Sequence, residues 1–128
     1  MTATDDELID LLEVFSAAFA RQDAVALGAL FDEDDVCFIA SESLVLHDRA
    51  RMESFFDDYS AHPDPVSFEW DSCQVSSDER FGWVSAFGRE IRQVGDTRTP
   101  SPFRITLVCR RRADGWRISH LHGSTPTR

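Results

Sequence analysis

Lysine is absent from this 128-residue chain, and its 13 lysine-or-arginine positions are all arginine. A Schiff base needs a lysine amine and a phosphate-binding P-loop needs a lysine, so the sequence excludes both. The chain also lacks any apolar run near the roughly 20 residues of a membrane-spanning helix. Its first ten residues are acidic and polar, unlike a secretion signal. We therefore expect a cytoplasmic protein that does not bind membranes.

Cysteine is scarce, with only Cys37, Cys73 and Cys109 in the chain. Their number is odd, they lie far apart, and each falls in an apolar run typical of a strand. This pattern favours reduced core cysteines over disulfides, metal ligands or nucleophiles.

Positive charge is also scarce, because the formal net charge is −10. Residues 1–64 carry 16 acidic side chains against 3 arginines, whereas residues 65–128 carry 7 against 10. An acidic chain matches a phosphate backbone poorly, so we expect no nucleic-acid partner. The arginine-rich half can still hold a small anion.

Hydrophobic periodicity divides the chain into a helical part and a strand part. Apolar residues recur at helical spacing in residues 8–19, and Asp23 and Asp48 are suited to cap two further helices. Strand patterns cover residues 36–41, 66–75, 80–94, 103–112 and 116–124, and residues 95–102 are expected to form a flexible loop. This order predicts an α+β fold, in which three N-terminal helices pack on a strongly curved, mostly antiparallel sheet as a cone-shaped roll. We expect one domain over residues 1–128.

The C-terminal stretch "PFRITLVCRRRADGWRISHLHGSTP" (102–126) resembles the ending of the SnoaL-like family within the nuclear-transport-factor-2-like (cystatin-like) superfamily, which includes the ketosteroid isomerases. "RQDAVALGALF" (21–31), "FEW" (68–70) and "GWVSAFG" (82–88) are also similar to it. The resemblance implies a homodimer that pairs through the outer sheet face. It also implies a small organic ligand, such as a carboxylate or an aromatic molecule, in an apolar conical pocket. Cofactor-free isomerisation, cyclisation or hydration is the reaction class it suggests, and whether the protein is an enzyme stays open. The alternative is a non-enzymatic association module that resembles the association domain of calcium/calmodulin-dependent kinase.

The same resemblance disfavours ketosteroid isomerase chemistry. That reaction uses an aspartate base with a tyrosine and a protonated aspartate as the oxyanion hole. The base position falls on or beside Ala40, the tyrosine position near Phe15, and the second acid within residues 105–109, which contain no carboxylate. All three roles are therefore expected to be lost.

His120 and His122 are the candidate catalytic residues. Strict alternation along the last strand would place them on one face with Trp116, Ile118 and Ser124. Three interpretations stay open: structural histidines in the sheet or at a dimer seam, acid–base histidines in the pocket, and metal ligands, of which the last is least favoured because no third ligand is evident. We expect no metal and no cofactor.

The candidate ligand-binding residues are arginines and aromatic side chains. Arginine suits a planar carboxylate, and tyrosine and tryptophan combine an apolar ring with a polar group. These candidates are Arg104, Arg89, Trp70, Trp83, Tyr59 and Phe19. By contrast, the acidic cluster 32–35 and the arginine run 110–112 are interpreted as solvated segments.

Overall fold

The computed structural model describes residues 3–40 and 44–126, which form three helices and six strands. The helices are α1 (Ala3–Ala20), α2 (Ala24–Ala29) and α3 (Arg49–Ser60). The strands are β1 (Cys37–Ile39), β2 (Val45–Leu46), β3 (Val66–Ser77), β4 (Phe81–Val94), β5 (Thr97–Arg112) and β6 (Gly115–Ser124). The two helix caps follow the prediction. Asp23 accepts a hydrogen bond from the backbone of Ala26 at 3.0 Å, and Asp48 accepts one from Arg51 at 2.8 Å.

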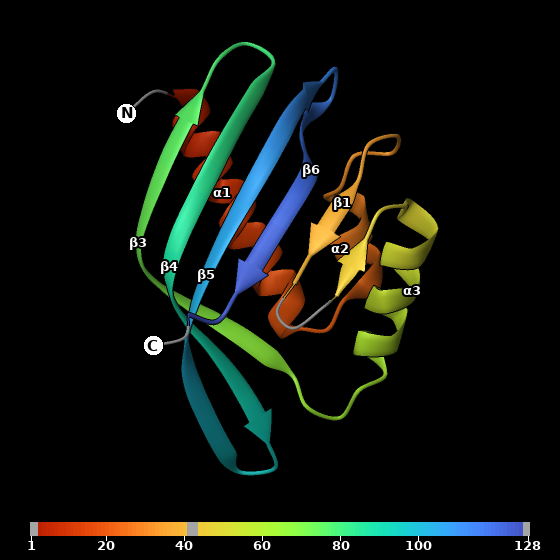
Figure 1. The fold of residues 1–128 in the computed structure, drawn as a ribbon, viewed down its shortest axis with the longest axis vertical. Helices are drawn as coiled ribbons and strands as arrows, with labels where there is room; N and C mark the ends of the chain where they lie inside the picture. The colour runs from red at the N-terminus through yellow and green to blue at the C-terminus, as the bar shows by residue number, and fades with distance from the viewer. Residues whose placement is uncertain (1–2, 41–43, 127–128) are drawn as a thin grey trace.

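All six strands of the described residues belong to one open sheet, in the order β2-β1-β6-β5-β4-β3. Every neighbouring pair is antiparallel except β1 and β6, which are parallel. Figure 1 shows the long strands curving around α1, with α3 beyond the edge strand β2. The predicted α+β roll is therefore confirmed, with a mixed and unclosed sheet.

The core lies between α1 and the inner, concave face of the sheet. Leu8, Leu12 and Phe15 of α1 are at most 2% exposed, as are Val84 of β4 and Leu107 of β5. The outer face of β4 carries larger and more exposed side chains at alternate positions. No helix in the described part of the chain is long and apolar enough to span a membrane.

The prediction of a flexible loop at residues 95–102 is wrong. Gly95 and Asp96 alone make the turn, and β5 begins at Thr97 and pairs with β4 from Val94 onward. Pro100 and Pro102 do not prevent this pairing, because they lie beyond the last residue that pairs with β6, at a free strand edge where no amide hydrogen is needed. β4 and β5 therefore extend past the sheet as a two-stranded ribbon (Figure 1).

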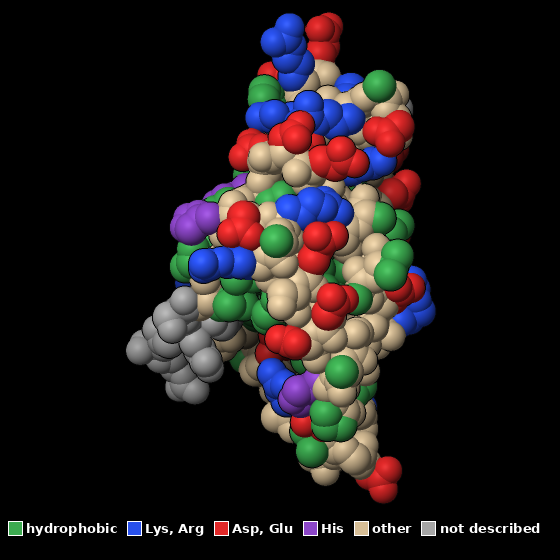
Figure 2. Space-filling model, turned by 90° about the vertical axis from the view of Figure 1, so that its right-hand side faces the viewer, with side chains coloured by type: hydrophobic (Ala, Val, Ile, Leu, Met, Phe, Trp, Pro, Cys, Tyr) green, Lys and Arg blue, Asp and Glu red, His purple; other side chains and the backbone are tan. Residues whose placement is uncertain are grey.

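The two segments interpreted as solvated are joined to each other. Arg112 donates two hydrogen bonds to the carboxylate of Asp32, at 2.6 and 2.7 Å, and Asp32 is only 1% exposed. Arg110 lies 3.2 Å from Asp35. Acids of the N-terminal half thus pair with arginines of the C-terminal half. Figure 2 shows acidic and arginine side chains intermixed on the face it presents.

Candidate functional site

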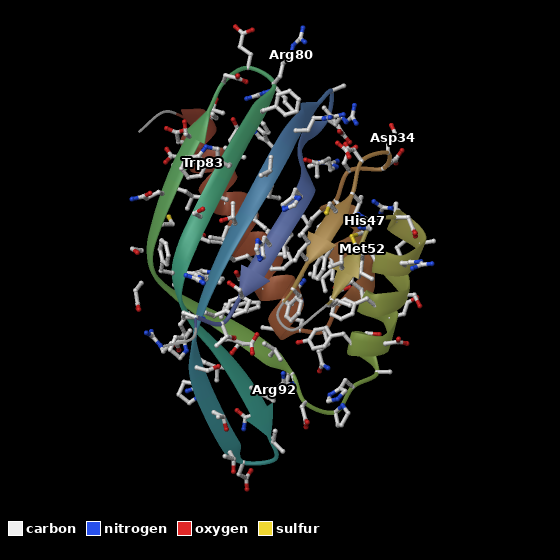
Figure 3. All side chains as sticks on the ribbon, in the orientation of Figure 1. Asp34, His47, Met52, Arg80, Trp83 and Arg92 are labelled. Atoms are coloured by element: carbon white, nitrogen blue, oxygen red, sulfur yellow. The ribbon has the colours of Figure 1, made fainter. Side chains whose placement is uncertain are left out.

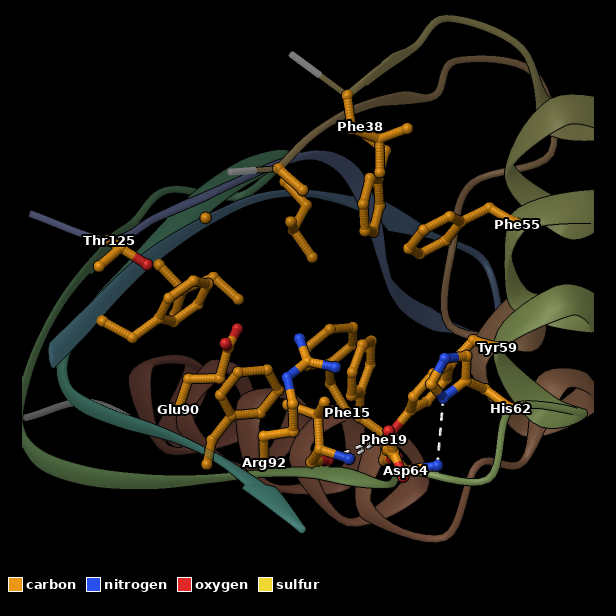
Figure 4. Close-up of a pocket in the computed structure, with 18 of the residues that line it drawn as sticks. Phe15, Phe19, Phe38, Phe55, Tyr59, His62, Asp64, Glu90, Arg92 and Thr125 are labelled. Atoms are coloured by element: carbon orange, nitrogen blue, oxygen red, sulfur yellow. Dashed lines mark hydrogen bonds between the residues drawn. The ribbon is translucent and has the colours of Figure 1, made fainter. Parts of the chain in front are cut away.

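A cavity of about 460 Å³ lies between α1, α3 and the inner face of the sheet (Figure 4). Seven aromatic side chains line it, from both helices, β1, β3 and β5: Phe15, Phe19, Phe38, Phe55, Tyr59, Phe68 and Phe103. The rings support one another, because Phe19 stacks on Tyr59 at 4.4 Å and Phe68 on Phe103 at 5.4 Å between centroids. Such a wall is apolar, and the volume of the cavity suits a small organic molecule.

Two charged side chains of β4, Glu90 and Arg92, also line this cavity. They alternate on the strand, so both point to its inner face, and Figure 4 shows the carboxyl and the guanidinium directed into the hollow. Within residues 3–40 and 44–126, neither side chain has a hydrogen bond or an ion pair to another residue. Burial raises the pKa of Glu90, and the nearby charge of Arg92 opposes this only in part.

Tyr59 has a structural role in the cavity wall. Its hydroxyl accepts a hydrogen bond from the backbone N–H of Val66 at 2.8 Å and lies 2.7 Å from the carbonyl oxygen of Phe19, to which it donates. Burial raises the pKa of this hydroxyl. Because its hydrogen-bonding capacity is already used, Tyr59 presents mainly its ring to the cavity.

His62 lies at the rim, just after α3. Its Nδ1 accepts a hydrogen bond from the backbone N–H of Asp64 at 3.1 Å, so the neutral ring carries its proton on Nε2. Gln22 fixes this segment, because its side-chain amide donates to the carbonyl oxygens of His62 at 2.6 Å and Tyr59 at 2.9 Å. Gln22 adopts a φ of 56°, which is uncommon for a residue with a side chain.

The structure separates the candidate ligand-binding residues. Phe19 and Tyr59 line the cavity, whereas Trp70 stands behind it, stacked on Phe68 and donating a hydrogen bond to Ser16 at 3.0 Å. Trp83 lies on the outer face and is 39% exposed, at the far end of β4 from Arg92 (Figure 3). Trp83 therefore does not reach the cavity.

Arg104 and Arg89 also lie on the outer face of the sheet. Arg89 is held by Asp71 at 2.8 Å and by Glu69 at 3.3 Å. Arg104 donates a hydrogen bond to Ser124 at 3.1 Å and shares a shallow outer groove with His122. Neither arginine can contact a molecule in the conical cavity.

A β-bulge puts His120 and His122 on the outer face too. His120 pairs with Val108 and Ile118 with Cys109, so Ser119 is an extra residue in β6. Ile118 and Leu121 are buried on the inner face, and the histidines between and after them point outward. The prediction that Ile118 shares a face with the histidines is therefore wrong, because the bulge reverses the alternation.

The positions assigned to the lost isomerase residues do lie in the cavity. Phe15, Ala40 and Ile105 all line it, and none carries an ionisable group. Among the described residues, no three histidine, cysteine or acidic side chains are grouped as a metal would require. The ionisable side chains that line the cavity come from elsewhere in the fold: Asp58, Tyr59, His62, Asp64, Glu90 and Arg92.

The SnoaL-like domain family matches residues 8–128. The chain belongs to this family.

Solved structures with the same fold include a candidate dehydratase of the NTF2-like family from Streptomyces avermitilis. It has 19% identity and a TM-score of 0.87, and the match covers 97% of this chain and 96% of that one. A candidate calcium/calmodulin-dependent kinase II association domain from Thiobacillus denitrificans has 25% identity and a TM-score of 0.70, covering 91% and 93%. A ketosteroid isomerase-like protein from Erwinia carotovora atroseptica has 14% identity and a TM-score of 0.76, with full coverage of both chains. The search of curated proteins found no match.

Sequence reasoning missed Glu90, Arg92 and His62 in this SnoaL-like domain. A signal for the first two was present, because strand alternation puts residues 90 and 92 on the same face of β4 as the small residues Gly82, Ala86 and Gly88. They were overlooked because the opposite face of this strand, which carries Trp83 and Arg89, was expected to line the pocket. His62 has no such signal, because its position depends on how α3 ends.

Proposed function

We propose that this SnoaL-like domain binds a small organic molecule with an aromatic or similarly apolar body and one anionic oxygen group in the conical cavity. The observation that carries the proposal is an aromatic cavity of about 460 Å³ with an unpaired guanidinium, that of Arg92, directed into it. The rings would hold the apolar body, and the guanidinium would take the anionic group. Arg92 thus replaces Arg104 in the role suggested by the sequence.

Cofactor-free isomerisation, cyclisation or hydration is the reaction class we propose for this site. Such reactions need groups that give and take protons beside an apolar substrate, and Glu90 in the cavity and His62 at its rim meet this need. The similarity to a candidate dehydratase supports the same class. The free cysteines support our proposal that the protein works in the cytoplasm.

Two matched probes test the proposal by titration calorimetry. Phenylacetate and 2-phenylethanol share a ring and chain length and differ in the anionic group. We expect phenylacetate to bind with a dissociation constant on the order of 1 mM. Arg92→Gln should weaken phenylacetate about tenfold, equivalent to about 1.4 kcal/mol, and leave 2-phenylethanol unchanged.

A cavity-filling variant is the second arm of this test. Ala40 lines the cavity, so Ala40→Phe should abolish binding of both probes. Arg104→Gln, on the outer face, is the control and should bind both probes as the unaltered protein does. The proposal is wrong if neither probe binds, or if the Arg104 variant loses binding and the Ala40 variant keeps it.

A second candidate function is association between copies of the chain. Phe81, Trp83 and Phe87 on the outer face of β4 are 39–50% exposed, and exposed aromatic side chains in a row are typical of an interface. The similarity to a candidate association domain supports this alternative. We propose a homodimer through the outer sheet face, which is compatible with a ligand in the cavity on the opposite face.

A further inference from the structure

Glu90 has an environment unlike that of the other acidic side chains on β3 and β4. Glu69 and Asp71 both face solvent and both pair with Arg89. Glu90 is partly buried instead, faces the aromatic cavity, and has no hydrogen-bond partner in the described part of the chain. A carboxyl group in such a place is stabilised when it is protonated or when a ligand supplies a partner.

We propose that anion binding in the cavity is coupled to the uptake of one proton by Glu90, which then donates a hydrogen bond to the same anionic group that Arg92 holds. This inference rests on the proposed function, because it needs an anion in the cavity. It adds that Glu90 is the proton-exchanging residue of the site, and that it selects the anion by donating a hydrogen bond to it.

The placement of Glu90 and Arg92 carries the argument. Residues i and i+2 of a strand lie roughly 7 Å apart on one face, so an oxygen group of a ligand can lie between the two side chains and contact both. If Glu90 and a ligand carboxylate were both ionised at that distance, they would repel each other strongly in an apolar cavity. The repulsion is removed when one proton from solvent joins the Glu90 carboxylate, giving a neutral acid that donates to the bound anion.

The other ionisable groups around the cavity come from α3 and the segment after it, and not from the strand that carries Arg92. Asp58 and Tyr59 come from α3, and His62 and Asp64 follow it. The inner faces of β3, β5 and α1 contribute only apolar side chains to the lining, as do β1 and β6. His62 is the competitor to test, because its imidazole is the other proton-exchanging base among the residues that line the cavity.

The coupling has a defined sign. An anion that favours protonated Glu90 raises the pKa of Glu90 above its value in the empty cavity, where burial has already raised it. Affinity for the anion is therefore highest at low pH and falls as pH rises through the pKa of the empty protein. A neutral ligand produces no such dependence.

Titration calorimetry with phenylacetate in phosphate and in Tris buffer at the same pH measures the proton uptake, because the two buffers differ in ionisation enthalpy. We expect uptake approaching one proton per phenylacetate for the unaltered protein and for His62→Gln. We expect none for Glu90→Gln, which keeps the hydrogen-bond donor, and none for 2-phenylethanol. The affinity of Glu90→Gln should vary less than twofold between pH 5.5 and pH 8, where that of the unaltered protein falls at least fivefold.

Each outcome separates the two proposals. Absence of binding by both probes overturns the proposed function, and with it this inference. Binding of phenylacetate without proton uptake overturns the inference alone. So does uptake that persists in Glu90→Gln, or uptake that disappears in His62→Gln. Glu90→Gln keeps the size of the side chain, and unaltered binding of 2-phenylethanol by each Gln variant shows that it is folded.

Discussion

Asp32 shows how one buried charge is stabilised in this fold. Its carboxylate accepts two hydrogen bonds from Arg112 and one each from the backbone N–H groups of Asp34 and Asp35. These contacts, above all those from Arg112, lower the pKa of Asp32 from 3.8 to about 2, although burial acts in the opposite direction. The backbone of Asp32 also pairs with Ile118, so this residue joins the end of α2 to β6.

Asp32→Asn should reduce the free energy of unfolding by about 2 kcal/mol at pH 7, because the ion pair is lost and Arg112 keeps a neutral partner. The pKa of Asp32 is lower in the folded state, so its stabilisation is complete above about pH 4 and is lost as pH falls toward pH 2. Urea unfolding at pH 7, 4 and 2.5 should therefore show the difference between the two proteins shrinking at the lowest pH. Asp34→Asn is the control, since Asp34 is 86% exposed and lies 3.9 Å from Arg112. An equal loss of stability in that variant would contradict this account.

At the scale of an element, β4 determines the shape of the cavity. Its inner face begins with small residues and ends with Glu90 and Arg92. Gly88 pairs with Trp70, where β3 has a bulge, and a Cβ atom at Gly88 would meet the backbone oxygen of Glu69. This close approach of two backbones supports the curvature of the sheet.

Gly88→Ala should destabilise the protein by roughly 3 kcal/mol, because backbone atoms of β3 would have to move. Gly28→Ala is a matched control within α2, where the nearest atom to a new Cβ is the end of the Arg49 side chain at 3.7 Å. That variant should be neutral or gain about 0.5 kcal/mol, since alanine favours a helix. Urea unfolding measures both values, and equal destabilisation by the two substitutions would argue against the close approach at Gly88.

Individual strands and helix caps show which features of the fold local sequence patterns predict. Alternation divided the residues of β4 and β5 into two faces but did not show which face lines the cavity, because Trp83, Arg89 and Arg104 were expected there and lie on the outer face. The caps at Asp23 and Asp48 were visible in their residue types. Alternation failed in β6, because the bulge at Ser119 depends on pairing with β5, and one extra residue exchanges inner and outer faces. The buried Asp32 and the rim position of His62 are set by contacts between distant segments, which no local pattern encodes.

At the scale of the whole molecule, the sheet has two chemically different faces. The inner face encloses the cavity, and the outer face carries exposed aromatic rings together with Arg104, His120 and His122. The inner face is the one proposed for a ligand, and the outer face is the one proposed for a second copy of the chain. The placement of the histidines on the outer face favours their interpretation as residues of a dimer seam.

Trp83→Ser should raise the dissociation constant of the homodimer at least tenfold. Trp83 is a large exposed ring on the outer face of β4, and large aromatic side chains contribute much of the binding energy of an interface. Sedimentation equilibrium should give twice the monomer mass for the unaltered protein and a lower, concentration-dependent mass for the variant. Val25→Ser is the control, since Val25 is 85% exposed on α2, away from the sheet, and its loss should leave the mass unchanged. A monomeric unaltered protein, or a dimer that both variants keep, would contradict pairing through the outer face. If dimerisation is lost while phenylacetate binding is kept in Trp83→Ser, the two faces act independently, as their separation across the sheet requires.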